Sequence, residues 1–431
     1  QIVSLTFTNK AADEMRTRVE ALAPQQSVWM STFHRFAARL LRTHAPLVGL
    51  DENFTIYDAD DSRQVVRRVL EDMNIDRTHV TPERISGAIS WSKNRLVAAD
   101  QFQPRSGKPV DHIVAQAYPE YQARLLASSA VDFDDLLLHL ATLLQSNPEL
   151  RATLDDRFRY VLVDEYQDTN LAQYAILRAL SADYPNLAVT GDPDQSIYSW
   201  RNADIRNILS FQQDYPLTKT IALEQNYRST STILEAAKSL ISSNGMRLRK
   251  DLFTENDAGD PITVHEAYDE QEEAGFVVSK IKDLRNKQTY KLGDCAVMYR
   301  INAQSRALEE ACIQQGIQYR LVGGVRFYQR REIKDLMGYM HLIHNPQDEV
   351  NLTRVINVPP RGIGAKSLKD FINWCRDNQI TLYEGIQKTY ESKISGSQAT
   401  PTLSNRAVAS IANFGEIIQS LVTLSQSAPI T

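Results

Sequence analysis

The apolar run at residues 161–163 ends in two adjacent carboxylates, Asp164 and Glu165. A β-branched run of this kind predicts a buried strand, and a strand delivers the residues that follow it to the edge of a sheet. At such an edge one carboxylate can hold Mg²⁺ while its neighbour orients an attacking water. A core strand followed by a solvated acidic turn is the alternative. The next residues, Gln167 and Asp168, and a second strand downstream favour the chemical interpretation.

Two further segments carry residues that could act on a phosphate or a base. The first, residues 187–201, opens with a predicted strand and continues into a polar loop that holds a glutamine, two aromatic residues and an arginine. The second, residues 223–229, reads Leu-Glu-Gln-Asn-Tyr-Arg-Ser. A glutamine after a neighbouring strand can reach the same phosphate as the carboxylates, and an arginine can bring a planar cation to it.

In this order, the three segments resemble the motifs of superfamily-one DNA helicases of the UvrD, PcrA and Rep type. The resemblance runs from Val3 to about Phe371 and is greatest to the PcrA and UvrD branches. It implies an ATP-dependent 3′-to-5′ DNA helicase in DNA repair or replication, with ATP and Mg²⁺ as cofactors. The implied partners are single-stranded DNA, junctions of single-stranded and duplex DNA, and accessory proteins.

The resemblance also implies roles for individual residues. Asp164 would hold the Mg²⁺, Glu165 would polarise the attacking water, and Gln195 would contact the γ-phosphate and couple its hydrolysis to DNA. Arg228 would act as an arginine finger and Tyr227 would pack on the nucleotide base. An ion pair with the glutamate four residues earlier is the alternative for Arg228, and the surrounding motif favours the phosphate role.

Aromatic residues stand at the ends of predicted elements, where they can be exposed to stack on DNA bases. An isolated aromatic residue is more often part of a core, and the pair Trp200-Arg201 after a polar loop is the clearest exception. The resemblance implies DNA contacts for Phe7, Asn9, Thr32, His34, Phe133, Tyr198, Trp200, Arg201, Asn302, Arg326, Gly362 and Gly364.

Two of these expectations depend on backbone conformation. Gly362 and Gly364 precede a predicted helix and could present N–H groups to a duplex phosphate, although an ordinary tight turn is the default interpretation of the pattern. Asn202 stands where the family usually has glycine.

The alternation of strands and helices predicts an α/β fold. With the resemblance, it indicates P-loop NTPase (RecA-like) parallel-sheet domains with helical insertions, incomplete at both ends. The expected strands are 2–7, 160–163, 187–190, 220–223, 261–265, 295–299 and 318–322. The expected domains are a first RecA-like domain (1–54 and 151–222), a helical insertion without strands (55–150), a second RecA-like domain (223–330) and a partial helical subdomain (331–431).

Composition limits the class of protein. A chain of 431 residues suggests two or more domains, and its net charge of −5 lacks the basic footprint of many nucleic-acid binders. The three cysteines form no CxxC pair and indicate reduced thiols. We find no signal peptide and no run near the ~20 apolar residues of a membrane span, so we expect a cytoplasmic protein without a membrane partner.

The chain opens with Gln1 inside an apolar strand and contains no G-x-x-x-x-G-K-[ST] loop. In the helicase family this phosphate loop lies just before such a strand. We therefore expect a fragment that lacks the loop at one end and later motifs at the other, and that is inactive by itself.

Two alternatives to a helicase of the UvrD type remain open. The first is the motor subunit of a helicase–nuclease of the AddA or RecB kind, although the insertion at 55–150 is short for that class. The second is a non-catalytic scaffold that binds single-stranded DNA. A scaffold would not need the carboxylates and the arginine described above.

Overall fold

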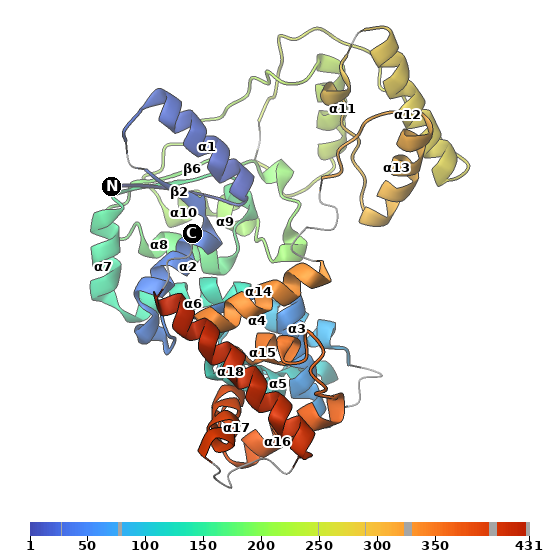
Figure 1. The fold of residues 1–431 in the computed structure, drawn as a ribbon. Helices are drawn as coiled ribbons and strands as arrows, with labels where there is room; N and C mark the ends of the chain where they lie inside the picture. The colour runs from blue at the N-terminus through green and yellow to red at the C-terminus, as the bar shows by residue number, and fades with distance from the viewer. Residues whose placement is uncertain are drawn as a thin grey trace. The chain divides into compact units, whose positions relative to one another are not determined.

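The computed structural model describes residues 1–26, 28–75, 80–248, 250–288, 290–322, 330–395 and 403–427. Two compact units account for these residues, and Figure 1 labels their elements. Unit 1 contains Gln1–Thr220, Met246–Leu248 and Asp335–Thr431, and unit 2 contains Ile221–Gly245 and Arg249–Lys334.

A four-stranded parallel sheet organises the first part of unit 1. Its strands are β1 (Ile2–Thr6), β2 (Trp29–Thr32), β5 (Tyr160–Val163) and β6 (Leu187–Val189), in the order β2-β1-β5-β6. Because all four strands are parallel, their carboxyl ends lie at one edge of the sheet. The expected strands at 2–7, 160–163 and 187–190 are confirmed within one residue at their ends.

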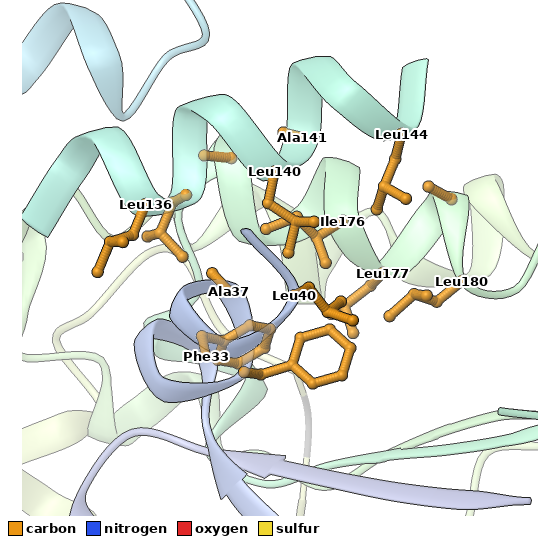
Figure 2. Packing of buried hydrophobic residues seen from close by; sticks show 14 of the residues in the cluster. Phe33, Ala37, Leu40, Leu136, Leu140, Ala141, Leu144, Ile176, Leu177 and Leu180 are labelled. Carbon is orange, nitrogen blue, oxygen red and sulfur yellow. The ribbon is translucent and has the colours of Figure 1, made fainter. Parts of the chain in front are cut away.

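Helices cover this sheet and supply most of its core. They are α1 (Asn9–Leu22), α2 (Phe33–Thr43), α6 (Phe133–Ser146), α7 (Pro148–Arg157), α8 (Leu171–Ala179), α9 (Arg206–Leu209) and α10 (Phe211–Asp214). Helix α2 buries residues 33, 36, 37, 40 and 41, the spacing of one face of a helix. Figure 2 shows this face meeting Leu136, Leu140 and Leu144 of α6, and Ile176 and Leu177 of α8, in one apolar layer.

The insertion between β2 and β5 is mainly helical, with α3 (Ala59–Asp72), α4 (Pro82–Lys93) and α5 (Pro109–Ala127). The prediction that it contains no strand is wrong. Two short strands, β3 (Thr55–Tyr57) and β4 (Ala130–Asp132), pair in parallel. Each has only three residues, too few for an alternating pattern to be recognised, and their pairing joins positions far apart in the sequence.

Further helices follow residue 330. They are α14 (Arg331–His344), α15 (Glu349–Val355), α16 (Ala365–Asp377), α17 (Leu382–Ser395) and α18 (Asn405–Ser427). Among them, α15 packs against α3 of the insertion. After α14, the amide Nδ2 of Asn345 donates to Thr55 Oγ1 at 3.0 Å and to the Ser128 carbonyl at 2.9 Å. The Tyr57 hydroxyl donates to Asp348 Oδ1 at 2.9 Å. Buried polar contacts therefore join these helices to β3 and its surroundings.

Helix α18 is long and apolar enough to cross a membrane by length and composition, with 33% of the relevant window buried. Its residues Ile411, Phe414 and Ile418 are buried in one apolar cluster with Phe371 of α16 and Ile386 of α17. These residues form the buried face of α18.

Unit 2 is built from α11 (Ser231–Ile241), α12 (Glu270–Asn286) and α13 (Ser305–Gln314). Its small core joins Ala274 and Val278 of α12 to Ala311 and Ile317. The expected second RecA-like domain, 223–330, falls within this unit, and its assignment stays a prediction.

The strands expected at 220–223, 261–265, 295–299 and 318–322 are not formed in the part of the chain that the structure describes. A strand requires a hydrogen-bonded neighbour, and the described residues show only an isolated bridge, Gln225 to Phe253. Apolar side chains of these segments are exposed instead, including Val264, Met298 and Val322. An apolar pattern alone therefore overpredicted strands here.

Candidate nucleotide and DNA site

Backbone hydrogen bonds draw the carboxyl ends of three strands together. The Asp164 N–H donates to the Leu5 carbonyl at 3.0 Å, and the Tyr166 N–H donates to the Thr190 carbonyl at 3.0 Å. The Thr190 N–H in turn donates to the Val163 carbonyl at 2.8 Å. The two carboxylates after β5 are therefore held between the ends of β1 and β6.

Glu165 has a backbone conformation that side chains rarely adopt. Its φ of 54° and ψ of 41° lie in the left-handed region, where a non-glycine residue is uncommon. The turn leaves Glu165 exposed and Asp164 half-buried. Burial, and then the negative charge of Glu165, raise the pKa of Asp164.

This edge has the chemistry of a magnesium site. Burial and the charge of Glu165 also raise the pKa of Asp168 to about 6, and its Oδ1 is buried without a hydrogen-bond partner. Two more buried oxygens without partners, Thr6 Oγ1 and Ser31 Oγ, lie at the ends of β1 and β2. The described residues contain no cluster of three metal-binding side chains. Mg²⁺ typically takes only one or two carboxylates together with substrate phosphates, so the donors present fit it.

Gln167 is the residue whose role the sequence did not reveal. It is 1% exposed, its Nε2 donates to Glu165 Oε2 at 2.8 Å, and its Oε1 accepts from the Asp192 N–H at 2.9 Å. The Gln195 Nε2 donates to Asp192 Oδ2 at 2.8 Å. A Cβ at Gly191 would lie 2.7 Å from Gln167 Oε1, so glycine permits this approach. One buried amide thus links Glu165 to the loop that holds Gln195.

The same loop is held from a distant part of the chain. Arg247 donates from Nε to Asp194 Oδ1 at 3.0 Å and from Nη2 to Asp194 Oδ2 at 2.9 Å. Such a two-point contact fixes orientation as well as distance. The sequence contains no sign of this pair, because an arginine in a polar stretch has no distinguishing pattern.

Several residues expected to contact DNA lie close together in unit 1. The rings of His34 and Phe133 are 6.0 Å apart, edge to face, and Phe7 contacts Phe33 at 6.0 Å. Phe133 is 52% exposed at the start of α6. Thr32 is the N-cap of α2, where its hydroxyl accepts from the Arg35 N–H, and Asn9 is an exposed residue at the start of α1.

Next to them, Tyr198, Trp200 and Arg201 form a second aromatic group. The rings of Tyr198 and Trp200 are 6.1 Å apart, and the Arg201 guanidinium lies 5.3 Å and 4.6 Å from their centroids. Trp200 is 64% exposed, which excludes a core role. Burial lowers the pKa of His34, with the charge of Asp134 raising it and that of Arg201 lowering it. His34 therefore lies close enough to Asp134 and Arg201 for their charges to shift its pKa.

The turn at Asn202 explains why either glycine or asparagine can stand there. Its φ of 65° and ψ of 17° are left-handed, a conformation that glycine adopts freely and asparagine tolerates. The departure from the family's usual residue leaves the turn intact.

Four of the remaining candidates lie outside unit 1 or outside the described residues. Tyr227, Arg228 and Asn302 belong to unit 2, and Arg326 lies outside the described residues. Arg228 is exposed, and among the described residues it forms no ion pair with Glu224, whose carboxylate accepts from the Asp251 N–H at 3.0 Å.

Gly362 and Gly364 lie in unit 1 at the start of α16. Gly362 has a φ of 79°, and Gly364 is the N-cap. Arg361 beside them points inward, where it donates to carbonyls that include Val355 and Val358 at 3.1 and 3.0 Å. The turn is thus braced from within, and both glycines stay exposed.

A parallel sheet with a carboxylate pair at its edge, followed by a glutamine loop and exposed aromatic residues, is the arrangement that the resemblance to helicases implies. The chain matches the UvrD/REP helicase N-terminal domain over residues 1–216 and the UvrD-like helicase C-terminal domain over residues 221–395. It belongs to the UvrD/REP helicase family, and its RecA-like P-loop fold follows from that membership.

Three proteins similar to this chain carry the name PcrA. The chain is 41% identical over 432 residues to the ATP-dependent DNA helicase PcrA of Bacillus subtilis (strain 168), covering 100% of this chain and 57% of the relative. It is 44% identical over 424 residues to PcrA of Staphylococcus aureus (strain Mu50), covering 98% and 57%. It is 42% identical over 434 residues to PcrA of Leuconostoc citreum, covering 100% and 57%. The chain therefore spans 57% of the length of these relatives.

Proposed function

We propose that this chain is the core of an ATP-dependent DNA helicase that moves 3′-to-5′ on single-stranded DNA and unwinds duplexes in repair or replication. The observation that carries the proposal is the buried Gln167, which joins Glu165 to the loop of Gln195. That loop continues into the exposed Trp200. The carboxylates suited to hydrolysis are therefore hydrogen-bonded to the loop that leads into the aromatic residue suited to stacking on a base.

Each side chain has a task in hydrolysis. Asp164 would hold Mg²⁺, which when bound neutralises charge on the β- and γ-phosphates of ATP. Glu165 would orient the attacking water and accept its proton, and its turn already directs the carboxylate outward. Gln195 would hydrogen-bond the γ-phosphate and lose that bond when the phosphate leaves. Arg228 would bring a cation to the γ-phosphate, and Tyr227 would pack on the adenine.

The DNA would follow the aromatic surface of unit 1. Phe7, Phe133, Tyr198 and Trp200 would stack on successive bases, a mode of binding that tolerates any sequence. Polar contacts to the strand would come from Asn9, Thr32, His34, Arg201, Asn302 and Arg326. The backbone N–H groups around Gly362 and Gly364 would meet a duplex phosphate.

Two rival functions predict different neighbours for the chain. A motor subunit of the AddA or RecB kind would carry a nuclease domain in the same gene product, and a scaffold would lack a phosphate loop there. The sequence of the complete gene product separates all three, because a helicase of the UvrD type requires a G-x-x-x-x-G-K-[ST] loop and no nuclease domain.

The decisive experiment is Glu165→Gln in the complete gene product, assayed for DNA-stimulated ATP hydrolysis. The substitution keeps the shape and removes the charge, and loss of a general base typically costs about 10²–10⁴-fold in rate. We expect kcat to fall by about 100-fold or more while Mg-ATP still binds. Glu149→Gln, at an exposed glutamate of α7, is the matched control and should be silent. A Glu165→Gln kcat within a few-fold of the parent would remove Glu165 from this role.

Residues 1–431 alone should not hydrolyse ATP at a useful rate, because the sequence contains no phosphate loop to cradle the β- and γ-phosphates. Phosphate release by the purified chain, with and without oligo-dT, measures this. Robust DNA-stimulated release from a preparation free of other ATPases would contradict the assigned site.

A further inference from the structure

The first observation concerns the acidic residue after Phe133. Phe133 opens α6, and the N-terminus of α6 is fixed by a capping box between Asp132 and Asp135. Asp134 is half-buried, and its Oδ1 accepts a hydrogen bond from Asn94 Nδ2 at 2.8 Å. The end of another helix therefore contacts the side chain next to Phe133 in the first turn of α6.

Asn94 lies where three helices meet. It is the C-cap of α4 and is 4% exposed. Its Oδ1 accepts from the Asn170 side chain, which is the N-cap of α8, and its carbonyl accepts from the Ala172 N–H at 3.3 Å. One side chain thus joins α4 of the insertion to α6 and to α8.

Asn170 continues this connection to the carboxylate segment. Its neighbour Thr169 is fully buried, and the Thr169 hydroxyl donates to the Tyr166 carbonyl at 2.7 Å. Asn207 Nδ2 and the Asp204 N–H donate to the Thr169 carbonyl at 3.0 and 2.9 Å. The Thr169 carbonyl therefore also binds the segment that follows the aromatic group at 198–201.

We propose that Asn94 is a positioning residue that couples DNA at Phe133 to ATP hydrolysis at the 164–168 segment. The proposal rests on the helicase function proposed above. A base that stacks on Phe133 shifts the start of α6. Asn94 transmits this shift through its hydrogen bond with Asn170 to the turn that carries Glu165. A purely apolar contact would set only the distance between the helices at this junction. Hydrogen bonds on both sides of one amide set both the distance between the helices and their orientation.

The test uses Asn94→Ala in the complete gene product, with basal ATPase, DNA-stimulated ATPase, oligo-dT affinity and melting temperature all measured. We expect the stimulated kcat to fall about tenfold, equivalent to about 1.4 kcal/mol, with basal ATPase unchanged. The second variant, Asp134→Ala, cuts the same link at a half-buried position and should reproduce the loss even if Asn94→Ala does not fold.

Asn147→Ala is the matched control. Asn147 caps α7 through a 3.0 Å bond from the Leu150 N–H and lies outside the connection. It should lower the melting temperature without changing the ratio of stimulated to basal ATPase. Unchanged stimulation in both Asn94→Ala and Asp134→Ala would overturn the coupling. A parent protein that DNA does not stimulate would instead overturn the proposed function, so the two failures are distinguishable.

Discussion

Replacing Lys93 by methionine should destabilise unit 1 strongly. Lys93 is fully buried at the end of α4, and its Nζ lies 2.7 Å from Asp132 Oδ2 and 2.7 Å from Asp135 Oδ1. Methionine keeps the length of the side chain and removes the charge, leaving two buried carboxylates beside each other. Breaking a buried ion pair in this way typically costs about 3–5 kcal/mol, a large share of the ~5–15 kcal/mol that stabilises a domain.

The remaining hydrogen bonds do not replace the ammonium. The Tyr121 hydroxyl donates to Asp132 Oδ2 at 2.8 Å, and Gln122 Nε2 donates to Asp135 Oδ1 at 3.0 Å. Both donors are neutral, so they satisfy lone pairs without cancelling charge. The expected loss at about pH 7.5 is therefore near the full range given above.

The stability loss caused by Lys93→Met should depend on pH. Burial and the charge of Asp135 raise the pKa of Asp132 to about 6 even with Lys93 present. Removing the ammonium should raise it further. A carboxyl whose pKa in the folded state is above its unfolded value of 3.8 binds more protons when folded. Its contribution to stability is therefore lost as the pH rises from the unfolded pKa through the folded pKa. The cost of Lys93→Met should therefore be smaller at about pH 5.5 than at about pH 7.5. His139, which faces Asp135, would protonate more easily in the variant and acts in the same direction.

Urea unfolding followed by tryptophan fluorescence measures this cost. Trp91 reports on the site, since it lies two residues before Lys93 and is covered by the Arg95 guanidinium at 4.4 Å. Lys108→Met, at an exposed lysine of the same insertion, is the matched control and should change stability by less than about 0.5 kcal/mol. A loss below about 1 kcal/mol for Lys93→Met, or a loss that grows on acidification, would refute the reasoning.

Three more predictions follow from the same structure. Trp200→Ala should weaken binding of oligo-dT by about tenfold without lowering the melting temperature, because the ring is 64% exposed; an early-melting variant with normal affinity would contradict this. Asn202→Gly should be tolerated, whereas Asn202→Val should cost about 1–2 kcal/mol in urea unfolding at a φ of 65°, and equal stabilities would exclude the left-handed turn. Burial lowers the pKa of His139 below 6.5, so its contribution to stability is lost as pH falls, and His139→Gln should lose less stability than the parent between about pH 7.5 and 5.5.

The sequence predicted three of the four strands of the sheet of unit 1 and missed β2 (Trp29–Thr32). Strands of parallel sheets often read as continuous apolar runs, and the runs at 160–163 and 187–190 became β5 and β6 with at most one residue of difference, although Tyr160 and Leu162 are exposed. The same rule failed for 261–265 and 295–299, where an apolar run found no paired neighbour among the described residues. It also missed β3 and β4, which are too short to show a pattern.

The candidate site was predictable where motifs are contiguous and unpredictable where contacts span the sequence. Asp164 and Glu165 follow β5 directly, and Gln195 lies in the loop after β6, so each could be named from one contiguous motif of the resemblance. The ion pair between Arg247 and Asp194 joins residues 53 positions apart, and the bond between Asn170 and Asn94 joins residues 76 apart. A single sequence contains no signal for such pairs, since arginine and asparagine are common in polar segments.

The residues assigned to chemistry depart from local rules, and the residues around them obey those rules. Glu165 has a left-handed backbone, Asp168 keeps a buried oxygen without a partner, and Trp200 exposes a large aromatic ring. Each departure costs free energy that an inert scaffold would avoid. Gln167 and Asn94 beside them are hydrogen-bonded on both sides of their amides. Because a cation and phosphates would relieve the carboxylates and bases would cover the ring, a nucleotide and a DNA strand together remove these costs. The unsatisfied polar groups and the exposed ring therefore support the proposed DNA-dependent ATPase over a protein that only binds DNA.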